Sequence, residues 1–250
     1  MKELKWALNF AATLCEDDEV MPRNPVAAVT MHKQRAANRS LALDDLPEWW
    51  CKIQALPNPL RRAMHTLGIL SGLRPGALVS IRREWIDLGN QVINIPYTHM
   101  KSNEAFALPL SGHMRNVVRT AISIGDLTYA DCEWLFPSRS KDGKSVIATQ
   151  VWKEKSLPSE TGHILRHTYR TIAETAGIPP THRRLLLDHA LGGMDKEYVD
   201  KTQLFRDLLN SQEVMSDRIL ELCKTQPNKS APQKSLASSE NKAAFKQGQA

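Results

Sequence analysis

Apolar residues recur every three to four positions along most of the chain, which is the spacing of an amphipathic α-helix. Proline and glycine mark where helices end: Pro22 and Pro25 follow the first helical stretch, and Gly177 and Pro179 follow a later one. The pattern predicts helices over residues 2–16, from Leu46 onward, and over residues 60–71, 112–124, 148–156, 161–176, 183–189 and 204–223. The last of these can be one helix or a helix pair, and a short helical turn is expected at Tyr198.

Two short segments break this helical pattern. Val92–Ile95 and Phe106–Pro109 are predicted to be β-strands, with the polar residues 98–103 forming a turn between them. A third apolar segment, Trp134–Pro137, is predicted to be buried and to end at its proline. Helices therefore dominate, and the predicted fold class is α+β, mainly α, with a small antiparallel β-sheet.

The same pattern suggests three parts of the chain. A sequence of 250 residues that is 42% apolar can build one large or two small domains around a core. We expect residues 1–40 to form an N-terminal helix and linker, and residues 41–223 to form the main domain. Residues 224–250 contain almost no large apolar side chain and are expected to be a disordered basic tail.

The charge balance agrees with a polyanionic partner without requiring one. The chain has 33 Lys and Arg against 27 Asp and Glu, a net charge of +6. The tail alone holds five lysines and one glutamate, so it carries much of that excess. A polyanion-binding face on the main domain would have to come from local clustering of basic residues.

Composition also argues against several classes of protein. The four cysteines lie far apart with no Cys-x-x-Cys pair, which argues against a zinc module and against a secreted disulfide framework. No apolar run approaches the roughly 20 residues that span a bilayer. Residues 1–5 lack the apolar stretch of a signal peptide. We therefore expect reduced thiols and a cytoplasmic location.

Polar residues in fixed order carry the strongest signal. They are, in chain order, Arg74 in Ser71-Gly72-Leu73-Arg74-Pro75-Gly76, Lys101 in the predicted turn, His163-Ile164-Leu165-Arg166, and His189 with Tyr198 nine positions later. Singly, each has an ordinary explanation, such as a helix-end arginine, a solvated lysine or a core histidine. His163 and His167 could hold a metal at i and i+4, but the sequence offers no third ligand.

In this order and spacing, the signals resemble those of the tyrosine recombinases, the phage integrase family, from about Leu41 to about Cys223. The resemblance implies a helical catalytic domain with a small antiparallel sheet. It also implies a DNA strand transferase that cleaves and rejoins DNA through a 3′-phosphotyrosyl link, without a metal or other cofactor. Its biological role would be the integration or excision of a phage, prophage or genomic island.

The resemblance gives a role to each of six residues. Arg74 and Arg166 bind the phosphate, His163 handles a proton and hydrogen-bonds the phosphate, His189 adds a second phosphate hydrogen bond, Lys101 protonates the leaving 5′ oxygen, and Tyr198 is the nucleophile. The implied partners are double-stranded DNA attachment sites and other recombinase protomers in a tetrameric synapse. A DNA-bending host factor and an excisionase are further partners. Such a protein would be nucleoid-associated and would contact no membrane.

The residue types suit this chemistry. A tyrosine with a pKa of about 10 is protonated at neutral pH, and forming its phenoxide there costs about 4 kcal/mol. Cationic donors must offset that cost, and a guanidinium stays charged while bonding two phosphate oxygens at once. His163 and Arg166 are spaced i and i+3, so one helical face can direct both at the same phosphate.

Three features depart from the family pattern. Ala77 stands three positions after the first arginine, where an acidic residue is usual, and Asp188 stands before the second histidine, where glycine is common. Residues 1–38 resemble only the last helix and linker of a core-binding domain. Two alternatives therefore stay open: a DNA-binding integrase remnant with weak catalysis, and a topoisomerase that uses the same phosphotyrosyl chemistry.

Overall fold

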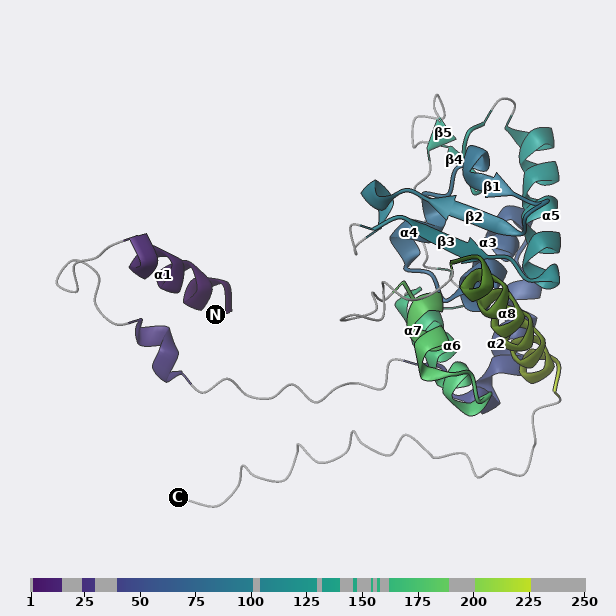
Figure 1. Cartoon of the computed structure of the whole chain (residues 1–250). Coiled ribbons are helices and arrows are strands. Elements are labelled where there is room, and N and C mark those ends of the chain that lie inside the picture. The colour runs from purple at the N-terminus through teal and green to yellow at the C-terminus, as the bar shows by residue number, and fades with distance from the viewer. Residues whose placement is uncertain are drawn as a thin grey trace, which may run out of the picture. The chain divides into compact units, whose positions relative to one another are not determined.

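The structure is a computed structural model, and it describes residues 2–14, 24–29, 40–100, 104–129, 132–139, 146–147, 154, 157, 162–188 and 201–225. The chain divides into two compact units, Met1–Asn38 and Arg39–Ala250. Figure 1 shows the elements of both units.

The N-terminal unit contains helix α1 (Lys2–Leu14) and the 3-10 helix η1 (Pro25–Ala28). Asn24 joins them. Its side-chain amide donates to the Lys5 carbonyl at 3.0 Å and to Asn9 Oδ1 at 2.7 Å, and its Oδ1 accepts from the Val26 N–H. The predicted helix over residues 2–16 is confirmed as far as the structure describes it. Several large apolar side chains of α1 remain exposed.

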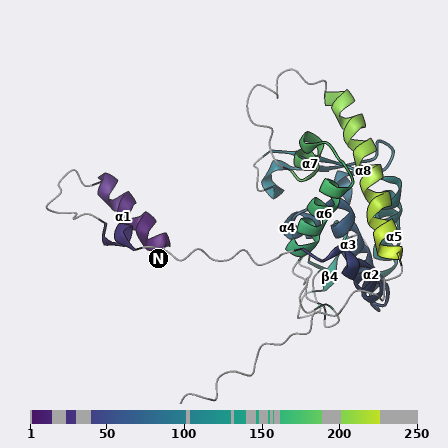
Figure 2. The ribbon, with the colours of Figure 1, turned by 90° about the horizontal axis from the view of Figure 1, so that it is seen from below.

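Helix α3 (Pro59–Ser71) is the central element of the larger unit, and ten of its 13 residues are buried. It packs against α2 (Leu46–Gln54), α5 (Gly112–Thr128), α6 (His163–Thr175) and α8 (Lys201–Lys224). Figure 2 shows α8 as one long helix with α6 and α3 beside it. Local sequence sets the limits of α3: the Asn58 side chain accepts from the first N–H groups of the helix, and Gly72 ends it.

A three-stranded antiparallel sheet lies above α6, α7 and α8 in the view of Figure 1. Its order is β1 (Ile86–Asp87), β2 (Val92–Ile95) and β3 (Phe106–Pro109). Ile93 pairs with Leu108 in the β2–β3 register, and both side chains are buried. The two predicted strands are confirmed with their bounds, whereas β1 is too short to show in the hydrophobic pattern. A second small sheet pairs β4 (Ser138–Arg139) with β5 (Val146–Ile147).

The mainly α fold class is confirmed, and the helices predicted from Leu46 onward and over residues 60–71, 112–124, 161–176 and 204–223 are all present, the last as one helix. The predicted helix over residues 183–189 is displaced: α7 covers Pro180–Leu186. Pro179 and Pro180 end the preceding helical pattern in the sequence, but proline also fits the first turn of a helix, and Pro180 begins α7. Pro75 starts α4 (Pro75–Val79) in the same way.

The predicted helix over residues 148–156 is wrong at Glu154. This residue forms an isolated β-bridge with Leu157. Its carboxylate accepts from Arg61 Nε and lies 3.3 Å from Nε2 of the fully buried His65. Two cationic or hydrogen-bonding groups on α3 therefore hold Glu154 in place, and this long-range pairing overrides local helical spacing.

A buried polar network ties three helices together. The Tyr169 hydroxyl on α6 donates to Gln212 Oε1 on α8 at 2.9 Å, and Gln212 Nε2 donates to the Leu70 carbonyl on α3 at 2.7 Å. Tyr169 and Gln212 are fully buried. Because each polar atom has a partner, the network adds orientation without the cost of an unsatisfied group. It fixes the rotation of α6 about its own axis.

Gly72 occupies a place where no side chain fits. Its φ of +60° lies in the left-handed region, and a Cβ built there would be 2.7 Å from the Tyr169 ring. Close approach of this turn to α6 therefore depends on glycine twice, once for the backbone angle and once for space.

Gly72→Ala is expected to lower the free energy of unfolding by about 2–4 kcal/mol, since it adds left-handed strain and overpacks the ring of Tyr169. The measurement is urea unfolding followed by circular dichroism.

Gly76→Ala is the matched control for this variant. A Cβ at Gly76 meets no atom within 4 Å, and the residue lies inside α4. The control should be at least as stable as the wild type, because alanine favours helix. Equal unfolding midpoints for Gly72→Ala and the wild type would contradict the role given to Gly72.

Candidate active site

The structure describes three of the six predicted site residues. Arg74, His163 and Arg166 lie within the described ranges. Lys101, His189 and Tyr198 lie outside them. The described part of the site therefore consists of Arg74, His163 and Arg166 and of the residues that bind them.

Arg166 is the most firmly held of these side chains. It extends from α6, and its Nη1 donates to the Gly72 carbonyl at 2.8 Å while its Nη2 donates to the Leu187 carbonyl at 2.5 Å. One guanidinium thus joins the turn after α3 to the turn after α7. Its planar fork suits this task, because donors at two ends of a rigid group can reach two carbonyls at once.

Arg74 lies at the edge of the same region. It occupies the N-cap position of α4, two residues after Gly72, and its side chain makes no capping bond there. Its Nη1 donates to Asp188 Oδ2 at 2.6 Å, and about a quarter of its side chain is exposed. Asp188 directly follows Leu187, which binds Arg166. Arg74 and Arg166, called the arginine pair below, are thus linked through one two-residue turn.

The charges of these groups influence one another. Burial, followed by the nearby charge of Arg74, lowers the pKa of Arg166 to about 10, and the charges of Asp188 and Tyr169 act in the opposite direction. This value is still well above neutral pH, so Arg166 is cationic there. The arginine pair consequently places two positive charges close together, and the carboxylate of Asp188 lies beside them.

His163 is the first residue of α6 and is exposed, one turn before Arg166. The predicted i, i+3 arrangement on a helix is confirmed. Over the described ranges, no three or more His, Cys, Asp or Glu side chains gather in a way that could hold a metal ion. The alternative of a metal at His163 and His167 therefore finds no third ligand in that part of the chain.

Ala77 and Asp188, the two residues near the site that depart from the family pattern, both lie within the described ranges. Ala77 is buried in α4 and offers Arg74 only a methyl group. The Asp188 carboxylate turns toward Arg74. Asp188 has a φ of +52°, and its N–H donates to the Leu185 carbonyl at 2.9 Å.

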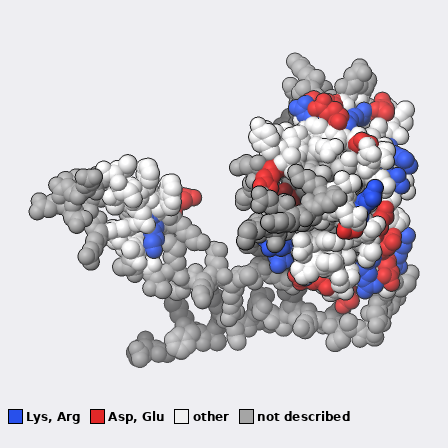
Figure 3. All heavy atoms as spheres, in the orientation of Figure 1, with Lys and Arg blue, Asp and Glu red and all other residues white. Residues whose placement is uncertain are grey.

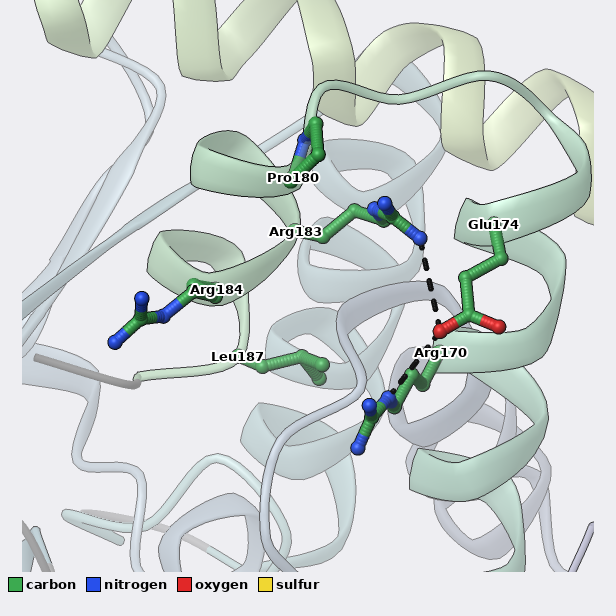
Figure 4. A pocket seen from close by; sticks show the side chains of 6 residues that line it. All are labelled: Arg170, Glu174, Pro180, Arg183, Arg184 and Leu187. Atoms are coloured by element: carbon green, nitrogen blue, oxygen red, sulfur yellow. Dashed lines mark ion pairs between the residues drawn. The ribbon is translucent and has the colours of Figure 1, made fainter. Parts of the chain in front are cut away.

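A basic pocket lies next to the turn that holds the arginine pair. Its cavity of about 340 Å³ is lined by Arg170, Glu174, Pro180, Arg183, Arg184 and Leu187. Glu174 pairs with Arg170 at 3.5 Å and with Arg183 at 3.6 Å, while Figure 4 shows Arg184 pointing away from them. Sequence reasoning missed these arginines, although Arg170 follows Arg166 by one helical turn.

Elsewhere the charges are mixed. Figure 3 shows basic and acidic side chains interspersed over the described part of the face it presents. Basic side chains, which a polyanion-binding face would need to cluster, gather at the turn and its pocket. They do not form one broad patch on the described part of the face in Figure 3. None of the helices in the described part combines the length and apolar character that a bilayer span requires.

Comparisons with known proteins point to one family. The family model described as "Phage integrase family" matches residues 51–204, a span that includes all six predicted site residues. Prophage integrase IntF of Escherichia coli K12 is 22% identical over a match of 204 residues, with 78% of this chain and 41% of that protein covered. Prophage integrase IntZ of the same strain is 27% identical over a match of 168 residues, with 64% of this chain and 40% of that protein covered.

A solved structure agrees at the level of the fold. The integrase from mycobacterium phage Brujita has a TM-score of 0.53 and 17% identity, with 89% of this chain and 75% of that chain covered. The chain spans about two fifths of the length of the two curated relatives. Since the family model matches more than half of its residues, the chain belongs to the phage integrase family, the tyrosine recombinases that its motifs resemble.

Proposed function

We propose that this protein is a site-specific DNA recombinase that cleaves and rejoins DNA through a 3′-phosphotyrosyl intermediate. One observation carries the proposal: in a chain of the phage integrase family, the turns after α3 and α7 bring Arg74 and Arg166 together. The second turn runs directly into His189 along the chain. The biological role we propose is integration or excision of a phage, prophage or genomic island.

The arginine pair suits a phosphodiester in the transition state. Arg166 is fixed by two backbone carbonyls, so its charge needs no reorganisation when the phosphate gains negative charge. Arg74 is partly exposed and can meet a phosphate that arrives from solvent. Donors fixed in this way are worth about 3–4 kcal/mol each when they stabilise developing charge.

The nucleophile we propose is Tyr198, one of four tyrosines in the chain. Tyr169, the tyrosine nearest Arg166 on α6, is unsuited to attack because it is fully buried and donates to Gln212. Burial also raises the pKa of Tyr169 far above its ordinary value, so its phenoxide is disfavoured.

In the proposed cleavage step, a bond from phosphorus to tyrosine replaces the bond from phosphorus to the 5′ oxygen. The Tyr198 oxygen attacks phosphorus and loses its proton, the bond to the 5′ oxygen breaks, and Lys101 protonates that leaving oxygen. His163 accepts the tyrosine proton and returns it in the reverse step. Both His163 and His189 hydrogen-bond the phosphate. The products are a 3′-phosphotyrosyl link and a free 5′ hydroxyl. Attack by a 5′ hydroxyl from another strand reverses the step and joins new ends.

The partners we propose are double-stranded attachment sites and further protomers in a tetrameric synapse, with a DNA-bending host factor and an excisionase. The proposed domain organisation is an N-terminal helix and linker over residues 1–40, a catalytic domain over 41–223 and a basic tail over 224–250. A cytoplasmic, nucleoid-associated location follows from this activity.

The test uses nicked duplexes with a randomised core, in which loss of the short strand after cleavage traps the covalent complex. Denaturing electrophoresis then reveals protein attached to DNA. We expect the wild type to form this complex and Tyr198→Phe to form none, because the variant lacks only the attacking oxygen.

Tyr97→Phe is the matched control, since Tyr97 is well exposed and lies in the 3-10 helix η4 (Tyr97–His99). It should form the complex at the wild-type level. Covalent complex in Tyr198→Phe would mean that the nucleophile is another residue. A wild type that binds DNA without attaching to it would favour the remnant. Relaxation of plasmid without strand exchange would favour a topoisomerase.

Lys101→Ala should cleave slowly on ordinary DNA and at close to the wild-type rate when sulfur replaces the 5′ leaving oxygen. A thiolate is a good leaving group and needs no acid. Single-turnover rates on the two substrates measure the effect, with Lys52→Ala on α2 as the control for loss of an exposed lysine. The same defect on both substrates would remove Lys101 from the role of general acid.

A further inference from the structure

We propose that Asp188 is a positioning residue, whose carboxylate holds Arg74 from the inner side and leaves the outer side of the guanidinium for the phosphate. The inference rests on the proposed function, because the position of Arg74 matters only if Arg74 binds a phosphate. It assigns a role to a residue at which this chain departs from the usual glycine.

The exposed fractions of the two side chains indicate whether Asp188 supports Arg74 or competes with the phosphate for it. The Arg74 side chain is 26% exposed, whereas the Asp188 side chain is 7% exposed, with 2.6 Å between Nη1 and Oδ2. A phosphodiester of a DNA duplex must approach from solvent. A carboxylate standing in its place would therefore be the more exposed partner of the pair. Since Asp188 is the more buried one, it lies behind Arg74 and does not occupy the phosphate position.

The backbone around Asp188 is built for this contact. Its φ of +52° lies in the left-handed region, which aspartate and asparagine adopt more readily than most residues. The N–H of Asp188 bonds to the Leu185 carbonyl, so the turn is closed. The preceding carbonyl, of Leu187, accepts from Arg166. Consecutive residues of one turn thus hold the two arginines, one through a carbonyl and the other through a carboxylate.

Helix α4, which follows Arg74, contains no acidic residue that could pair with this arginine, and Asp188 supplies the carboxylate. Ala77 lies one helical turn after Arg74 and cannot accept a hydrogen bond through its methyl side chain. Among the residues that the structure describes, Asp188 is the carboxylate paired with Arg74. The carboxylate that orients this arginine comes from the turn after α7 and not from α4.

A charge argument supports the same role. Two guanidiniums close together repel each other, and a buried carboxylate beside them reduces that repulsion. The charge of Asp188 raises the pKa of Arg166, opposite to the effects of burial and Arg74. With Asp188 in place, the three groups carry a net charge of about +1, which matches one phosphodiester anion.

The central variant is Asp188→Asn. Asparagine keeps the size of the side chain and tolerates the left-handed backbone, so the variant removes the charge with little disturbance. On a nicked duplex recovered from the wild-type covalent complexes, we expect its single-turnover cleavage rate to fall by about 10- to 100-fold, the scale of a misplaced catalytic group.

A double-mutant cycle separates positioning from general damage. If Asp188 acts through Arg74, then Asp188→Asn should lower the rate no further in an Arg74→Ala background. Damage elsewhere would lower the rate by the same factor in both backgrounds. Asp126→Asn is the matched control, because it also removes a carboxylate paired with an arginine, Arg83, but on α5. Its rate should equal that of the wild type.

Each other outcome overturns the inference in a recognisable way. A faster Asp188→Asn would mean that the carboxylate competes with the phosphate for Arg74. An unchanged rate, or additive losses in the cycle, would mean that Asp188 does not position Arg74, while the recombinase function stands. A wild type without covalent complex would instead remove the proposed function itself.

Discussion

The bonds from the Arg166 guanidinium to the carbonyls of Gly72 and Leu187 are the contacts on which the rest of this site depends. They join two turns that are far apart in the sequence, and each turn carries one member of the Arg74–Asp188 pair. A guanidinium that is largely withdrawn from water would be costly without such partners. Two carbonyls and a nearby carboxylate offset that cost, so the same cation serves both as a tie in the fold and as a charge for chemistry.

This tie needs α6 to keep a fixed rotation, and the buried polar network supplies it. Tyr169 lies one turn after Arg166 on α6 and reaches Gln212 on α8, which in turn reaches the backbone of α3. Helix α8 is therefore part of the support of the site, and it acts through Gln212. A shift of α8 would be transmitted to Arg166 through bonds between fully buried groups, which adjust poorly because every partner is fixed.

The sequence predicted well whatever depends on local pattern, and less well whatever depends on distant partners. Strands β2 and β3 and the helix that carries His163 and Arg166 follow from periodicity and turn residues. Pro180 misled the prediction of α7, because proline both stops one helix and starts the next. Glu154 and Asp188 could not be placed, because their orientation is set by arginines distant in sequence. The roles of Lys101, His189 and Tyr198 still come from their order along the chain alone.

The tight approach of Gly72 to the Tyr169 ring also has a consequence for how this family of sequences can diverge. A larger residue at position 72 requires both a smaller one at position 169 and a backbone angle outside the left-handed region, and losing the tyrosine hydroxyl leaves Gln212 without one of its partners. Positions 72, 169 and 212 lie on three different segments of the chain, yet none can change freely alone. They should therefore vary together among homologues, and this correlated substitution would trace the path from the arginine-bearing turn to the final helix.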